Sequence, residues 1–135
     1  MTPPKQHRLE IGGMMIEPDD LHFIGSDPYN AVHKFVVAVQ EDLLRIFVSI
    51  ARSHYEVRNA FKLKDEDIVG GGSVYIDRSN ILHLGDYSAD YNTIPKDIAE
   101  EFAQKIAELI RDTYHVQVDG TCASTTSNLN KYWKK

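Results

Sequence analysis

The loop from Gly85 to Asn92 is the first feature of this chain with an evident chemical use. It follows a predicted strand and leads into a strongly amphipathic helix, whose first N–H groups lack intrahelical partners. Together with the positive end of the helix dipole, such groups suit a phosphate-sized anion. The earlier run Gly70-Gly71-Gly72 allows close backbone approach or a positive φ. Both features are widespread, and a plain loop or bulge explains the glycines as well.

His54 is the side chain best suited to acid–base chemistry. The sequence Ser53-His54-Tyr55-Glu56 has the form of a capping box, so it predicts a helix that begins at His54. The positive end of the helix dipole disfavours the imidazolium, so a histidine there stays neutral and can accept a proton near pH 7. It could deprotonate an attacking water or take a phosphoryl group itself. A surface histidine beside a cap fits the same residues.

Composition narrows the function classes. A chain of 135 residues that is 42% hydrophobic and 26% charged predicts a single globular domain over residues 1–135. Its net charge of -5 argues against nucleic-acid binding, and no apolar run approaches the ~18 residues of a membrane span. The N-terminus lacks the apolar core of a signal peptide, and a lone Cys122, expected to be a free thiol, predicts a reducing cytoplasm.

The six histidines show no metal-ligand spacing, so neither a metal nor another cofactor is expected. His83 and His115 lie between apolar neighbours of predicted strands, where structural roles are expected.

The predicted elements alternate between strands and two helices. Residues 1–7 are expected to fray, residues 8–17 to form a hairpin that turns at Gly12-Gly13, and residues 17–30 to be mostly loop. Strands are expected at residues 34–40, 43–52, 73–77, 81–85 and 114–118, and helices at residues 54–63 and 95–111, the second with Thr93 as N-cap. A flexible tail is expected from Gly120 onward. Together these elements predict an α/β (α+β) fold with one mixed sheet of about six strands and a helix packed on each face.

Four pieces of the chain, read in order, resemble the phosphohistidine phosphatase (Janus/Ocnus) family. They are Lys34-Phe35 opening an apolar strand, His54 at a strand-to-helix junction, the run Gly70-Gly71-Gly72, and Leu82-His83-Leu84 followed by Tyr87-Ser88 and Tyr91. The resemblance covers roughly residues 32–118, and the order and spacing of the last two pieces contribute most to it.

The resemblance implies a metal-independent hydrolase of phosphohistidine or of a related N-phosphorylated group. Its substrate would be a phosphorylated protein or a small phosphorylated amine. His54 would be the general base, and Lys34 would supply positive charge to the phosphate. The backbone amides that would bind phosphoryl oxygens belong to Gly70, Tyr87, Ser88 and Asp90.

Several residues depart from the family pattern. Ser73 stands where the family usually has a basic residue, and Asp86 and Asn92 stand in place of glycines beside the loop tyrosines. Ser73, Asp86 and Asp90 dilute positive charge where a phosphatase would concentrate it. They favour an alternative, a non-catalytic phosphate- or phosphopeptide-binding regulatory module of the same fold. A third reading is a structural or oligomerisation domain that uses the N-terminal hairpin and the aromatic tail as surfaces.

Overall fold

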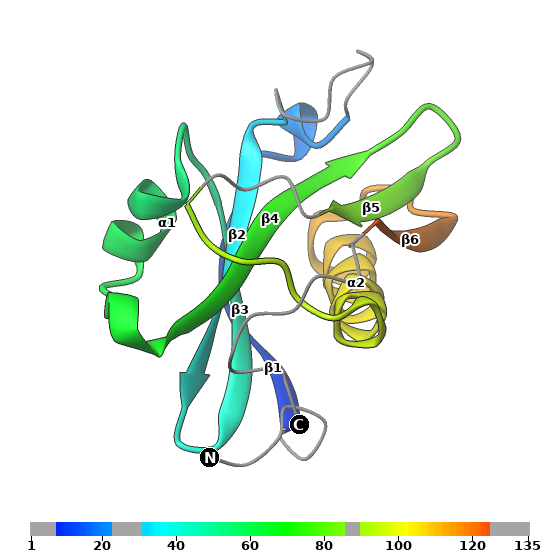
Figure 1. Cartoon of the computed structure of the whole chain (residues 1–135). Helices are drawn as coiled ribbons and strands as arrows, with labels where there is room; N and C mark the ends of the chain where they lie inside the picture. The colour runs from blue at the N-terminus through cyan, green and yellow to red at the C-terminus, as the bar shows by residue number, and fades with distance from the viewer. Residues whose placement is uncertain (1–7, 23–30, 86–89, 125–135) are drawn as a thin grey trace.

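A computed structural model describes residues 8–22, 31–85 and 90–124, which form one mixed six-stranded sheet with two helices packed against it (Figure 1). The strands are β1 (Arg8–Met15), β2 (His33–Gln40), β3 (Leu43–Ile50), β4 (Ile68–Ile76), β5 (Ile81–Gly85) and β6 (Gly120–Ser124). The helices are α1 (His54–Ala60) and α2 (Lys96–Leu109), with short helical turns η2 (Pro18–Asp20), η4 (Asp65–Asp67) and η5 (Ile110–Tyr114).

The sheet order is β1-β3-β2-β4-β5-β6. The outer pairs β1–β3 and β5–β6 are parallel, and the three inner pairs are antiparallel. The predicted fold class is therefore confirmed. Within the described residues, neither helix combines the length and apolarity needed to cross a membrane.

The central strand β2 divides the core into two layers. Phe35 and Val37 belong to a large cluster with the inward residues of α2, whereas Val36 and Ala38 pack with Val57 of α1. Because successive side chains of a strand point to opposite faces, the two helices cover opposite faces of the sheet, as Figure 1 also shows. The predicted helix on each face is confirmed.

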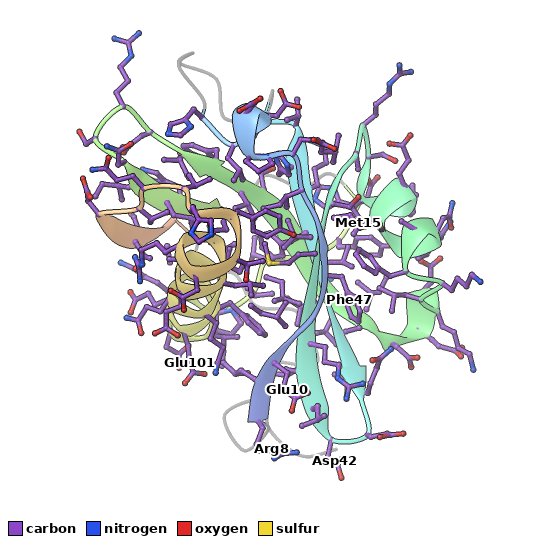
Figure 2. All side chains as sticks on the ribbon, turned by 180° about the vertical axis from the view of Figure 1, so that it is seen from behind. Arg8, Glu10, Met15, Asp42, Phe47 and Glu101 are labelled. Carbon is purple, nitrogen blue, oxygen red and sulfur yellow. The ribbon has the colours of Figure 1, made fainter. Side chains whose placement is uncertain are left out.

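The predicted N-terminal hairpin is wrong, because residues 8–15 form the single strand β1 parallel to β3. Figure 2 shows this strand running without a turn from Arg8 to Met15. The register shifts between Ile11 and Gly13, so Gly12 sits in a bulge, and a Cβ at Gly12 would collide with the ring of Phe47. The Gly-Gly pair therefore lets an aromatic ring lie on the strand instead of making a turn.

The end of the chain also differs from its prediction. Residues 114–118 form no strand, because α2 continues into η5 and ends at His115 in the left-handed conformation (φ 56°). His115 is thus exposed and outside any strand, contrary to prediction. The last strand of the described residues, β6, lies within the predicted tail and pairs in parallel with β5. The rest of that tail, residues 125–135, and the predicted frayed residues 1–7 lie outside the described residues.

The remaining boundaries shift by a few residues. The capping box at Ser53 is present, but α1 ends at Ala60 because Lys62 takes a left-handed φ of 55°, which terminates the helix before residue 63. α2 begins at Lys96 with Pro95, not Thr93, as its N-cap. The glycine run lies inside β4, which starts at Ile68 and not at residue 73.

His33, at the start of β2, is a fully buried histidine whose ring accepts a hydrogen bond. The backbone N–H of Glu17 donates to its Nε2 at 3.2 Å, which requires a neutral ring. Burial lowers the pKa of His33 below its ordinary value, and the nearby Asp20 only partly offsets this. His33 therefore ties the turn at η2 to the sheet only while it is unprotonated.

We expect acid to destabilise the fold through this residue. The unfolded chain takes up a proton as pH falls below about 6.5, whereas folded His33 does not, so stability present above that pH is lost as pH falls through the folded pKa. The melting temperature of His33→Gln should depend less steeply on pH between 7.5 and 5 than that of the wild type. His22→Gln, at an exposed site, controls for the loss of a histidine, and an unchanged slope in His33→Gln would contradict the assignment.

Candidate active site

His54 is the first residue of α1 and extends its ring onto the backbone of β4. The ring is buried, and its Nε2 lies 2.8 Å from the carbonyl oxygen of Gly72. A carbonyl oxygen can only accept, so Nε2 carries the hydrogen and Nδ1 of the neutral ring keeps the lone pair. The ring passes directly over Gly71, where a Cβ would come within 3.0 Å of Cδ2. The tautomer and the orientation of His54 are thus both set by the glycine run.

The electrostatic surroundings keep His54 neutral near pH 7. Burial is the largest cause, and it lowers the pKa of the imidazole below its ordinary value. The hydrogen bond to Gly72 opposes that effect, the charge of Lys34 lowers the pKa further, and Asp90 raises it. A neutral, fixed imidazole whose Nδ1 carries the lone pair is the state that a general base requires.

Asp90 places a carboxylate beside the proton-accepting nitrogen of His54. Its Oδ2 lies 3.6 Å from Nδ1 and accepts a hydrogen bond from the backbone N–H of His54 at 3.3 Å. The sequence predicts a backbone amide from Asp90 for the phosphate, and the structure adds a side chain that faces the histidine. A protonated Nδ1 would have its counter-ion in place.

Lys34 lies on the side of β2 that faces α1, since it shares the strand alternation of Val36. Its Nζ donates a hydrogen bond to the carbonyl oxygen of Ala31 at 2.9 Å. Burial lowers the pKa of this amine below its ordinary value, and the carboxylate of Glu56 opposes the shift. Because the charge of Lys34 also acts on His54, the structure brings these two predicted site residues together.

The three glycines of β4 allow close packing at this point, and no described glycine has a positive φ. A Cβ at Gly70 would strike the side chain of Ile94, and one at Gly72 would strike the carbonyl oxygen of Gly85. The N–H of Gly71 donates to the carbonyl oxygen of Asn92 at 3.0 Å. The segment from residue 90 to 95 therefore crosses over β4, as its yellow-green trace in Figure 1 shows, and brings Asp90 to the histidine.

A polar network at the outer rim holds this crossing segment and is not evident from the sequence. The hydroxyl of Tyr91 donates to Asp65 Oδ1 at 2.7 Å, and Arg58 of α1 binds both oxygens of Asp65 at 2.9 Å. Tyr55 lies under the guanidinium of Arg58, 4.9 Å from ring centroid to carbon. Burial and Asp65 raise the pKa of Tyr91, so its hydroxyl stays a donor. Of these residues, Tyr91 is part of the family motif and Tyr55 lies within the capping box, whereas Arg58 and Asp65 belong to no predicted motif.

Two predicted site residues, Tyr87 and Ser88, lie outside the described residues, as does Asp86.

Among the described residues, no group of three or more His, Cys, Asp or Glu side chains is arranged to hold a metal ion. Cys122 is an exposed free thiol, as predicted. His83 lies on β5 apart from these residues, with Nε2 2.7 Å from Asp77 and its ring stacked on Tyr75.

The site thus consists of a buried neutral histidine, a lysine and a carboxylate gathered around a glycine-rich strand of an α+β sheet. No protein-family model, curated protein or solved structure matches the chain significantly.

Proposed function

We propose that this protein is a metal-independent phosphoamidase that hydrolyses phosphohistidine or a related N-phosphorylated group, with His54 as its general base. The observation that carries the proposal is the hydrogen bond from His54 Nε2 to Gly72, which leaves Nδ1 of a buried neutral ring as the proton acceptor. The positive charge of Lys34 acts on the same imidazole.

The reaction needs little beyond a base and charge stabilisation. Nδ1 takes a proton from a water, the water oxygen bonds to phosphorus, and the P–N bond breaks with its electron pair going to the leaving nitrogen. The imidazolium then returns the proton to that nitrogen, so His54 is regenerated. Lys34 and backbone amides offset charge on the phosphoryl oxygens, which is the main task in phosphoryl transfer.

The resemblance to the phosphohistidine phosphatase (Janus/Ocnus) family supports the same proposal. Three of its four pieces, Lys34, His54 and residues 70–72, lie together around one point of β4. Tyr87 and Ser88 are proposed to complete the pocket with backbone amides. The substrate would be a phosphorylated protein or a small phosphorylated amine, and a reducing cytoplasm is the proposed compartment because the chain has a single cysteine.

A second candidate is a regulatory module that binds a phosphate group without turnover. The Asp90 carboxylate favours this second candidate. It accepts the hydrogen bond of the His54 backbone N–H, so negative charge already lies at a donor that a phosphate could use. The two candidates differ in one measurable property, the release of inorganic phosphate from a bound N-phosphorylated ligand.

Hydrolysis of phospholysine and phosphohistidine by the purified protein, with chelator present, tests the proposal. We expect turnover that resists the chelator and falls about tenfold or more in kcat/KM in Lys34→Gln, which corresponds to ~1.4 kcal/mol of lost transition-state stabilisation. Lys96→Gln removes an exposed lysine at the start of α2 and should retain wild-type turnover. Binding of these ligands without phosphate release would identify the regulatory module instead.

A further inference from the structure

A carboxylate at the centre of a phosphate site is chemically unusual and calls for a reason. Asp90 Oδ2 lies 3.6 Å from the nitrogen that would activate the attacking water, and the Asp90 side chain is only 23% exposed. Glu56 also acts on Lys34, so the described part of the site sets one cation against two carboxylates. A dianionic phosphate ester would meet net repulsion there.

We propose that Asp90 is a specificity-determining residue, which selects phosphoryl groups attached to a positively charged nitrogen and rejects phosphate monoesters. This inference rests on the proposed function and assigns its substrate class. The favoured ligands are N-phosphorylated amines of the phospholysine type, in which the nitrogen bonded to phosphorus is protonated at neutral pH.

Asp90 selects through its charge and its distance from the reacting group. A water bound to His54 Nδ1 touches the phosphorus that it attacks, and Asp90 Oδ2 lies 3.6 Å from that nitrogen. The Asp90 carboxylate therefore acts at short range on the phosphoryl group, and the leaving nitrogen lies one bond further away. Salt only partly screens charges separated by less than a Debye length of about 8 Å, least of all in a partly buried site. A protonated nitrogen on phosphorus offsets the phosphoryl charge and attracts the carboxylate, whereas an ester oxygen does neither.

The Asp90 carboxylate also favours cleavage of the P–N bond. A nitrogen that already carries its proton leaves as a neutral amine when it takes the bonding pair, so Asp90 stabilises the form of the substrate that is ready to react. The like charge of the Asp90 carboxylate, placed beside the competing ester, supplies the repulsive element that specificity usually needs. Asp90 also contacts His54, so a test must separate selection from positioning.

Binding of two small probes of nearly equal size makes that separation. Phosphoramidate carries a protonated nitrogen at pH 7, and methyl phosphate presents an ester oxygen in its place. In titrations followed by NMR, we expect the wild type to bind phosphoramidate at least about tenfold more tightly than methyl phosphate, a difference of ~1.4 kcal/mol. In Asp90→Asn the ratio should fall to about one or invert, since the carboxylate nearest the reacting group is gone and Glu56 alone opposes the positive charge of Lys34.

The asparagine oxygen can still accept from the His54 N–H, so this variant keeps the contact that orders the segment. Asp112→Asn, in the exposed turn after α2, removes the same charge elsewhere and should keep the wild-type ratio. If Asp90→Asn weakens both probes equally, Asp90 only positions His54 and the inference is overturned.

Turnover provides an independent readout. The ratio of kcat/KM for phospholysine to that for phenyl phosphate should fall about tenfold in Asp90→Asn. Turnover with an unchanged ratio overturns the inference and leaves the phosphoamidase assignment standing. Selective binding of phosphoramidate without turnover overturns the phosphoamidase assignment and leaves Asp90 as the selector of a binding module. A wild type that binds neither probe overturns both.

Discussion

Replacing His54 with glutamine is expected to lower kcat/KM for phospholysine by about 10²- to 10⁴-fold, the usual contribution of a general base. Glutamine is close in volume and its amide can donate to the Gly72 carbonyl as Nε2 does, so the buried site stays filled. What it lacks is a basic nitrogen at the position of Nδ1. The loss should therefore appear in the rate and leave the melting temperature nearly unchanged.

His83→Gln is the matched control for this experiment. His83 also pairs with a carboxylate, with 2.7 Å between its Nε2 and Asp77, but it lies on β5 and contacts neither Lys34 nor the glycine run in any interaction described for it. We expect turnover of His83→Gln to stay within about twofold of the wild type, as for a substitution that touches no catalytic group. Comparable losses in both variants would show that the effect is structural and would remove His54 from the role of base.

The pH profile distinguishes a base from a merely buried histidine. Because the pKa of His54 is lowered by burial and by Lys34, kcat/KM should be constant around pH 7 and fall only as pH drops through that lowered pKa. In Lys34→Gln the acid limb should move to higher pH, since the charge that depressed the pKa of His54 is gone.

The sequence predicts those elements whose side chains repeat regularly. The alternation of Leu44, Ile46 and Val48 predicts a strand, and all three are buried in β3. β6 carries no such signal, because among its five residues only Ala123 is buried, so an edge strand of small polar residues looks like a tail. At the other edge, Gly12-Gly13 looks locally like a turn, and only the distant rings of Phe47 over Gly12 and Phe61 over Gly13 explain why both residues are glycine.

The candidate site shows the same division between local and long-range information. The capping box places His54 at a helix start from four adjacent residues, and the structure has this box. No local pattern could link His54 to Asp90, which lies 36 residues further along the chain, or reveal that the Asp90 side chain faces the imidazole. The tautomer of His54 depends on a carbonyl oxygen of β4, and backbone contacts of this kind leave no mark on residue type.

The glycine run offers the second large expected effect, on stability. Gly72 is buried between β2 and β5, and a Cβ there would overlap the carbonyl oxygen of Gly85 and come within 2.7 Å of the Phe35 ring. Neither neighbour can yield cheaply, since the first is backbone and the ring of Phe35 is fully buried. We expect Gly72→Ala to reduce the free energy of unfolding by about 3 kcal/mol or more, the upper end for overpacked cores.

That loss corresponds to a fall of about 10 °C in melting temperature for a chain of this size, measurable by calorimetry. Gly120→Ala is the matched control, because a Cβ there meets only the terminal carbon of Ile81, at 3.1 Å, and its effect should stay below about 1 kcal/mol. Equal stability of the two variants would refute the close-packing role of Gly72.

The Gly72 carbonyl also fixes the tautomer of His54. Strand shifts that relieve the clash in Gly72→Ala would move this acceptor of Nε2, so any folded Gly72→Ala protein should lose turnover as well. The glycine run thus supports both the sheet and the base, and one substitution tests the dependence of the second on the first.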